Sequence, residues 1–212
     1  MKFSHSPSLE VIDLGRTDYA KASQLMLELV DEIVNGTKGD HLLLAEFESV
    51  LTVGRAEKTE AYQQLGIPVH EISRGGKVTY HGPGQLVIYP LISLHDKARD
   101  LHAYLNILEQ AMINVVNEFD LQGGRDQRNT GCWVNDRKIA SIGVAVRKWV
   151  TYHGVALNVN TDLSWFQRFD PCGLDPDVMT SMEQQLGHQV DMVQVKSAVI
   201  RQLQQTLTDN HR

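Results

Sequence analysis

The fold class is decided by residues 131–160, which read GCWVNDRKIASIGVAVRKWVTYHGVALNVN. Apolar residues alternate with small or polar ones along 138–146 and again along 155–159, and a period of two is typical of a half-buried strand. Asn135 and Asp136 provide a turn signal before the longer of these runs. The stretch therefore predicts strands joined by tight turns into an antiparallel sheet.

Outward from this region, helical and strand-like segments follow one another without a regular order. Apolar residues recur on one face of 18–34 and of 101–119, and Asp18 and Asp100 can cap these two helices. Further strands are expected at 41–47, 49–53, 69–73 and 84–94, and further helices at 162–168, from a capping box at 180–183, and at 192–208. Since strands and helices do not strictly alternate, we expect an α+β fold, with a largely antiparallel or mixed sheet packed with helices.

Pro90 lies inside 84–94, the most β-rich segment of the chain. Proline has no N–H group to donate to a neighbouring strand. We therefore expect this strand either to lie at an edge of the sheet or to be broken at Pro90.

Composition excludes several classes of protein. The chain has 212 residues, 42% of them apolar, and 26 acidic against 20 basic side chains, for a net charge of −6. This balance argues against general nucleic-acid binding, and no apolar run is long enough to cross a membrane or to act as a secretory signal. Two cysteines are too few for a disulfide framework. We therefore expect a cytoplasmic enzyme or binding domain that contacts neither nucleic acid nor membrane.

The segment 74–85, RGGKVTYHGPGQ, has the most unusual composition in the chain. Its four glycines allow backbone N–H groups to approach a ligand closely and to form a concavity for an anion. The order of residues fits neither a phosphate-binding loop nor a dinucleotide-binding loop. Two interpretations stay open from these residues: a ligand-binding loop, or two tight turns around a short strand.

Cys172 is the better of two candidate nucleophiles. It lies between Pro171 and Gly173, which favour a turn, whereas Cys132 lies in a strand-like run where a small buried residue is expected. An ordinary thiol is only slightly ionised at neutral pH, so catalysis needs a cation or a base beside the sulfur. The alternative is that both thiols are inert.

Three side chains are candidates for that neighbour, namely Lys138, His81 and His153. Lys138 opens an apolar run, where a lysine either extends its ammonium group to solvent or is held in a partly dry site. Only the second arrangement would tune a thiol. The two histidines could transfer protons or orient their loops. The nine histidines form no metal-binding motif and there is no C-x-x-C pair, so no metal is expected.

Four blocks of the sequence together resemble the lipoyl(octanoyl) transferase family, which is related to the biotin and lipoate protein ligases. They occur in the family's order, at 74–85, 131–143, 152–160 and 171–173. The resemblance implies a fold like the catalytic domain of biotin and lipoate protein ligases, as a single domain over residues 1–212. It implies transfer of an octanoyl group from octanoyl-acyl carrier protein, through a thioester, to a lysine of a lipoyl domain in lipoate biosynthesis, without a cofactor.

The acceptors that the resemblance implies are the lipoyl domains of 2-oxoacid dehydrogenases and the glycine cleavage H protein. It also implies that Cys172 is the acyl-thioester nucleophile and that Lys138 is its partner. The substrate contacts that it implies are Arg74, Gly75, Gly76, Lys77, Val78, Thr79, Tyr80, His81, Ser141, Ile142, Gly143, Gly154, Val155 and Ala156. Our candidate walls for the eight-carbon tail, with ordinary core packing as the alternative, are Val78, Tyr80, Ile142 and Val155.

Residues 125–148 carry six basic and two acidic side chains. Acyl carrier and lipoyl domains are acidic as families, so this strip is either a docking surface that steers them or a solvated hairpin edge. Three other functions compete: an ATP-dependent lipoate or biotin protein ligase, a non-catalytic module that binds acyl-carrier or lipoyl domains, and a thioesterase. Activity without nucleotide that requires Cys172 would exclude the ligase.

Overall fold

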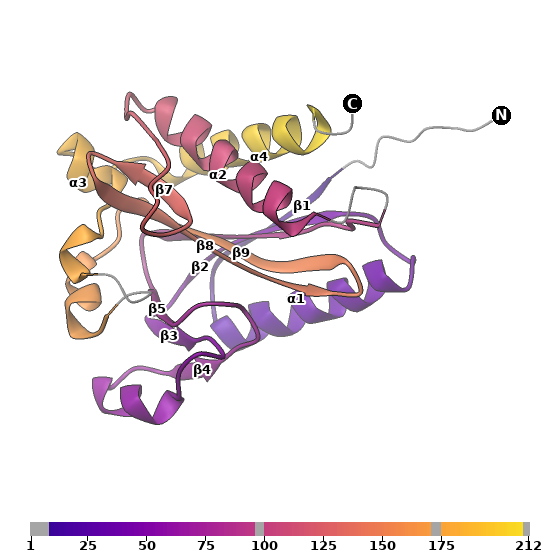
Figure 1. The fold of residues 1–212 in the computed structure, drawn as a ribbon, viewed down its shortest axis with the longest axis horizontal. Helices are drawn as coiled ribbons and strands as arrows, with labels where there is room; N and C mark the ends of the chain where they lie inside the picture. The colour runs from indigo at the N-terminus through magenta and orange to yellow at the C-terminus, as the bar shows by residue number, and fades with distance from the viewer. Residues whose placement is uncertain (1–8, 96–99, 171–174, 210–212) are drawn as a thin grey trace.

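The structure, a computed structural model, describes residues 9–95, 100–170 and 175–209 (Figure 1). Its main element is a six-stranded sheet in the order β1-β2-β6-β9-β8-β7. The strands are β1 (Glu10–Thr17), β2 (His41–Phe47), β6 (Gln85–Leu91), β7 (Gly131–Val134), β8 (Arg137–Arg147) and β9 (Val150–Asn158). Only the β1–β2 pair is parallel among the named strands of this sheet. The expected α+β fold with a largely antiparallel, mixed sheet is confirmed.

Helices cover both faces of this sheet. In Figure 1, α2 (Leu101–Asn117) and α4 (Met192–Asp209) lie on one face and α1 (Tyr19–Val34) lies on the other. Successive residues of a strand point to opposite faces, so Leu42 and Leu44 pack with α2 and α4 while Leu43 and Ala45 pack with α1. The side chains of Asp18 and Asp100 accept hydrogen bonds from first-turn N–H groups of α1 and α2, so both predicted caps are confirmed.

A smaller sheet lies beside the first, in the order β4-β3-β5. Its strands are β3 (Val50–Val53), β4 (Val69–Glu71) and β5 (Val78–His81). The short helices of the described chain are η1 (Thr59–Leu65), η2 (Leu163–Arg168), η4 (Pro176–Val178) and α3 (Met182–Leu186). The predicted start of α3 was one residue early, because Ser181 and not Thr180 accepts from the first turn. Among the described helices, none is long and apolar enough to span a membrane.

Strands β7, β8 and β9 are joined by two tight turns, of which the sequence predicted the first. Asn135 and Asp136 have φ of 49° and 59°, so a turn with two left-handed residues joins β7 to β8, as expected. Lys148 and Trp149 form a similar turn between β8 and β9, with φ of 47° and 62°. Neither residue is a usual turn former, so the sequence did not indicate this second turn.

Pro90 lies in an unbroken strand inside the sheet. β6 has β2 on one side and β9 on the other, and it runs through Pro90 to Leu91 while paired with β2, so both the edge and the broken-strand alternatives were wrong. Only the β6–β9 ladder is affected, since it ends at the pair Ile88–Val155, two residues before Pro90. Beside this point, a Cβ atom on Gly154 would lie 2.3 Å from the Ile88 carbonyl oxygen and 2.6 Å from Pro90 Cδ. Only glycine fits this close approach of the two strands.

Candidate active site

A cavity of about 300 Å³ lies against β5, β6, the glycine-rich loop, α2 and the β8–β9 hairpin. Most of the expected substrate contacts line it: Arg74, Gly75, Gly76, Thr79, His81, Ser141, Ile142, Gly143, Gly154, Val155 and Ala156. These residues come from three separate blocks of the sequence. The structure therefore favours the ligand-binding interpretation of the glycine-rich segment over that of two structural turns.

Three expected contacts do not line the cavity. Lys77 points away from it and pairs with Glu57, at 3.8 Å. Val78 and Tyr80 lie on the opposite face of β5 from Thr79 and His81, in a separate apolar cluster. The alternation of side chains along a strand allows only every second residue of β5 to face the cavity. Of the candidate tail walls, Val78 and Tyr80 therefore do not line this cavity, while Ile142 and Val155 do.

Several lining residues were not anticipated as site residues. Leu101 and Leu105 extend the wall from the N-terminal part of α2, and Tyr89 extends it from β6. Asn129 and Thr130 line it just before β7. The sequence held one signal for the last two, since they directly precede the block 131–143.

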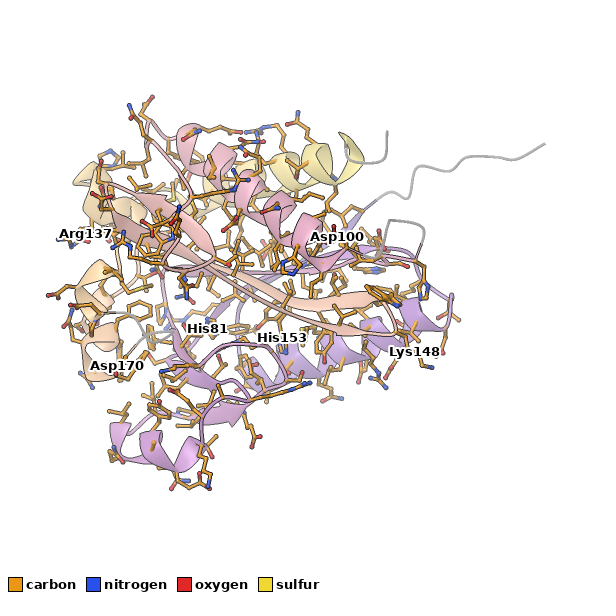
Figure 2. The ribbon with its side chains drawn as sticks, viewed as in Figure 1. His81, Asp100, Arg137, Lys148, His153 and Asp170 are labelled. Carbon is orange, nitrogen blue, oxygen red and sulfur yellow. The ribbon has the colours of Figure 1, made fainter. Side chains whose placement is uncertain are left out.

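Arg74 places a positive charge in the cavity wall. It is 7% exposed and donates to the Thr52 carbonyl at 2.9 Å, the Thr52 hydroxyl at 3.2 Å and the Gly75 carbonyl at 3.0 Å. Burial, aided by the charge of Arg74, lowers the pKa of His81 to about 4 and that of His153 to about 3. Both imidazoles, which lie near the middle of the molecule in Figure 2, are therefore neutral at physiological pH.

Hydrogen bonds fix the tautomer of His81. The Gln85 amide nitrogen donates to the Tyr80 carbonyl at 3.1 Å and to Asn158 Oδ1 at 2.9 Å. The Gln85 amide oxygen therefore faces His81 Nδ1, at 2.6 Å, and Nδ1 carries the proton. His81 Nε2 then accepts from the Thr52 hydroxyl at 3.3 Å. Of the two roles left open for His81, this network favours orienting the loop.

Lys138, the second residue of β8, is 1% exposed. Its Nζ donates to Asn129 Oδ1, so the side chain ends beside the cavity wall. A Cβ atom on Gly131 would lie 2.8 Å from Lys138 Cε. The aliphatic part of the Lys138 side chain therefore passes β7 at a glycine, where no side chain blocks it. Of the two alternatives for Lys138, the partly dry site is confirmed and extension to solvent is wrong.

Cys172 lies in 171–174, outside the described residues, and its role stays a prediction. The described chain returns to Lys138 soon afterwards, where Thr180 N donates to the Lys138 carbonyl at 3.0 Å. Cys132 is fully buried in the main core, and burial raises the pKa of its thiol to about 12. The Cys132 thiol therefore stays protonated at neutral pH, which agrees with its position in the core.

The expected basic strip over 125–148 is not one surface. Lys138 is buried, Arg125 pairs with Glu109 at 3.2 Å, and Arg147 pairs with Asp31 at 2.9 Å. Figure 2 shows Arg137 and Lys148 at opposite ends of the β8–β9 hairpin. Ten residues of extended strand separate those ends by roughly 33 Å, so the basic side chains of 125–148 do not form one compact cluster, and a docking role for them stays a prediction.

Comparisons with known proteins agree on one family. Residues 18–204 match the model of the lipoyl protein ligase A/B catalytic domain. The chain is 44% identical to an octanoyltransferase of Syntrophotalea carbinolica over 199 residues, which cover 94% of each chain.

Solved structures show the same fold at lower identity. One describes a bipartite lipoate protein ligase and its E2 lipoyl domain from Thermoplasma acidophilum, with a TM-score of 0.73, 18% identity, and coverage of 94% of this chain and 83% of that one. Another is lipoate-protein ligase A bound with ATP, with a TM-score of 0.71, 17% identity, and coverage of 94% and 84%. The chain belongs to the lipoyl protein ligase A/B catalytic domain family, and within it to the enzymes that transfer octanoyl groups in protein lipoylation.

Proposed function

We propose that the chain takes an octanoyl group from octanoyl-acyl carrier protein onto the Cys172 sulfur and passes it to a lysine of a lipoyl domain. The acceptors in this proposal are lipoyl domains of 2-oxoacid dehydrogenases and the glycine cleavage H protein. The observation that carries it is Lys138, a buried lysine whose Nζ ends beside the cavity. As an ammonium it can stabilise a thiolate, and as a neutral amine it can act as a base.

The two proposed steps exchange one acyl bond for another. In the first, the Cys172 thiolate attacks the thioester carbonyl, a new thioester forms, and the carrier-protein sulfur leaves as a thiol with a proton from the Lys138 ammonium, so that Lys138 becomes neutral. In the second, the acceptor amine attacks, an amide forms, Cys172 leaves as a thiolate, and the amine proton passes to Lys138. Nothing is oxidised or reduced, and the second step is downhill because an amide is more stable than a thioester. The reaction therefore needs no nucleotide.

The cavity suits the apolar tail of the proposed substrate. Ile142, Val155, Leu101 and Leu105 line it, and among its described lining residues Arg74 is the one charged side chain, because the two histidines are neutral. Burying about seven tail carbons is worth on the order of 5 kcal/mol at ~0.8 kcal/mol each. Backbone N–H groups of the lining glycines could hold the developing oxyanion, and losing one such donor typically costs ~3 kcal/mol.

The test is transfer without nucleotide. The purified chain is incubated with octanoyl carrier protein and a lipoyl domain, with and without ATP, and octanoylation of the acceptor is followed by mass spectrometry. We expect equal transfer in both samples, none with Cys172→Ser, and full transfer with the control Cys132→Ala. A requirement for ATP and free octanoate would instead support a ligase, and release of octanoate despite the acceptor would support a thioesterase.

We also propose that residues 1–212 act as one catalytic domain, a proposal supported by the family match over 18–204. A cytoplasmic location stays a prediction. Neither point changes the chemistry of the cavity.

A further inference from the structure

Asn129 contacts Nζ, the reactive atom of the Lys138 side chain. The amide oxygen of Asn129 accepts a hydrogen bond from Lys138 Nζ, and Asn129 also lines the cavity. The rest of the lysine is confined by β7, since its Cε lies against Gly131. The position of Nζ relative to the cavity therefore depends on where the Asn129 amide is held.

The loop that carries Asn129 is fixed at both ends. Gly124 and Trp133, on either side of Asn129, join the two ends by backbone hydrogen bonds of 2.8 and 2.9 Å. On the side that leads into β7, the buried Glu109 of α2 also accepts from Gly131 N at 2.8 Å. The Asn129 carbonyl itself accepts from the indole N–H of Trp133 at 3.0 Å. An asparagine held this firmly presents its amide in a defined place.

We propose that Asn129 is a positioning residue for Lys138, with a neutral oxygen that orients Nζ toward the cavity in both its charged and its uncharged form. This inference rests on the proposed function, in which Lys138 receives the proton of the acceptor amine. An amide oxygen accepts hydrogen bonds from an ammonium and from a neutral amine alike. A carboxylate in the same place would favour the ammonium and so oppose the loss of its proton.

The pH test compares variants of one chain, so groups that titrate equally in all of them do not obscure it. The described titratable or charged side chains on β8, on the elements packed against it and on the adjoining segments are His102, Tyr104, Glu109, Arg125, Asp126, Arg128, Cys132, Asp136, Arg137, Arg147, Tyr152, His153, Asp175, Asp177 and Glu183. Cys132 has a pKa of about 12 and His153 one of about 3, so neither changes charge between pH 6 and 10. Carboxylates and guanidinium groups ordinarily keep their charge over that range. In the octanoyl-enzyme, Cys172 is a thioester and does not titrate.

The experiment compares Asn129→Asp with wild type in the second step alone. Octanoyl-enzyme is prepared with octanoyl carrier protein, mixed with excess lipoyl domain, and the single-turnover transfer rate is measured from pH 6 to 10. We expect the rising limb of the Asn129→Asp profile to move by about 1–3 pH units to higher pH, with a loss of at least tenfold at pH 7 that high pH restores. The matched control is Asn135→Asp, which adds the same charge at the exposed turn between β7 and β8 and should leave the profile unchanged.

A second variant separates orientation from charge. Asn129→Ala removes the hydrogen-bond acceptor of Lys138 without adding a charge. We expect its single-turnover transfer rate to be lower than that of wild type at every pH, with little change in the KM for the lipoyl domain. A uniform loss in Asn129→Asp with no shift of the profile would overturn the proposal, as would wild-type rates in Asn129→Ala. If wild type itself formed no octanoyl-enzyme, the proposed function would fail first, and the two failures are distinguishable.

Discussion

At the scale of single residues, burial decides which groups around the cavity are charged. His153 combines three local features: it is buried, it faces the charge of Arg74, and it adopts a left-handed backbone with φ of 58°. Its Nε2 lies 3.4 Å from the Ser73 hydroxyl. Burial and the positive charge of Arg74 both favour the neutral imidazole of His153 over the protonated one.

His153 should make the fold sensitive to acid. Its pKa is about 3 in the folded chain, so between about pH 6.5 and 3 the unfolded chain binds a proton that the folded chain does not. Stability is therefore complete above that window and is lost as pH falls through it, by ~1.4 kcal/mol per pH unit. His153→Asn keeps a residue that tolerates a positive φ, and we expect its unfolding free energy, from denaturant titrations at pH 6, 5 and 4, to fall less steeply than that of wild type. Equal slopes would show that His153 does not carry this effect.

At the scale of elements, the helices and their caps were predicted more closely than the place of each strand in the sheet. The amphipathic periods and the caps Asp18 and Asp100 predicted α1 and α2 closely, because helical hydrogen bonds are local. The interior place of β6 depends on β2 and β9, which lie far away in sequence. No local pattern in the sequence indicated that Pro90 would follow the point where the β6–β9 ladder ends.

The close approach of β9 to β6 predicts a stability effect at Gly154. A methyl group there would overlap the Ile88 carbonyl, so we expect Gly154→Ala to lower the unfolding free energy by about 1–3 kcal/mol. Gly39→Ala is the matched control, since a Cβ atom at Gly39 meets nothing within 4 Å. Denaturant unfolding measures both variants, and equal stabilities would contradict the packing described for β6 and β9.

At the scale of the whole molecule, the cavity exists only because distant segments meet. The glycine-rich loop, β8 and β9 were expected from the sequence blocks, and most of their named residues do line it. Val78 and Tyr80 do not line it, because the face of β5 that they share packs against η2 in a separate cluster. The contribution of α2 through Leu101 and Leu105, and the contact of Asn129 with Lys138, were not predicted, since both arise from tertiary packing.

The proposed tail site makes a prediction for Ile142, which lines the cavity and is only partly buried. Ile142→Ala removes apolar contact worth roughly 1–2 kcal/mol, so we expect the KM for octanoyl carrier protein to rise about tenfold with less effect on a shorter acyl chain. Val193→Ala, at a 70% exposed position of α4, should leave KM unchanged. An equal effect of Ile142→Ala on both chain lengths would place the tail elsewhere.

The central claim is that the Cys172 sulfur carries the acyl group and that the buried Lys138 promotes its transfer. Intact-mass analysis followed by peptide mapping, after incubation with octanoyl carrier protein and no acceptor, tests it most directly. We expect a single octanoyl group on Cys172, both in wild type and in Cys132→Ala, and slower formation in Lys138→Met. An adduct on Cys132, or none on any cysteine, would contradict the account.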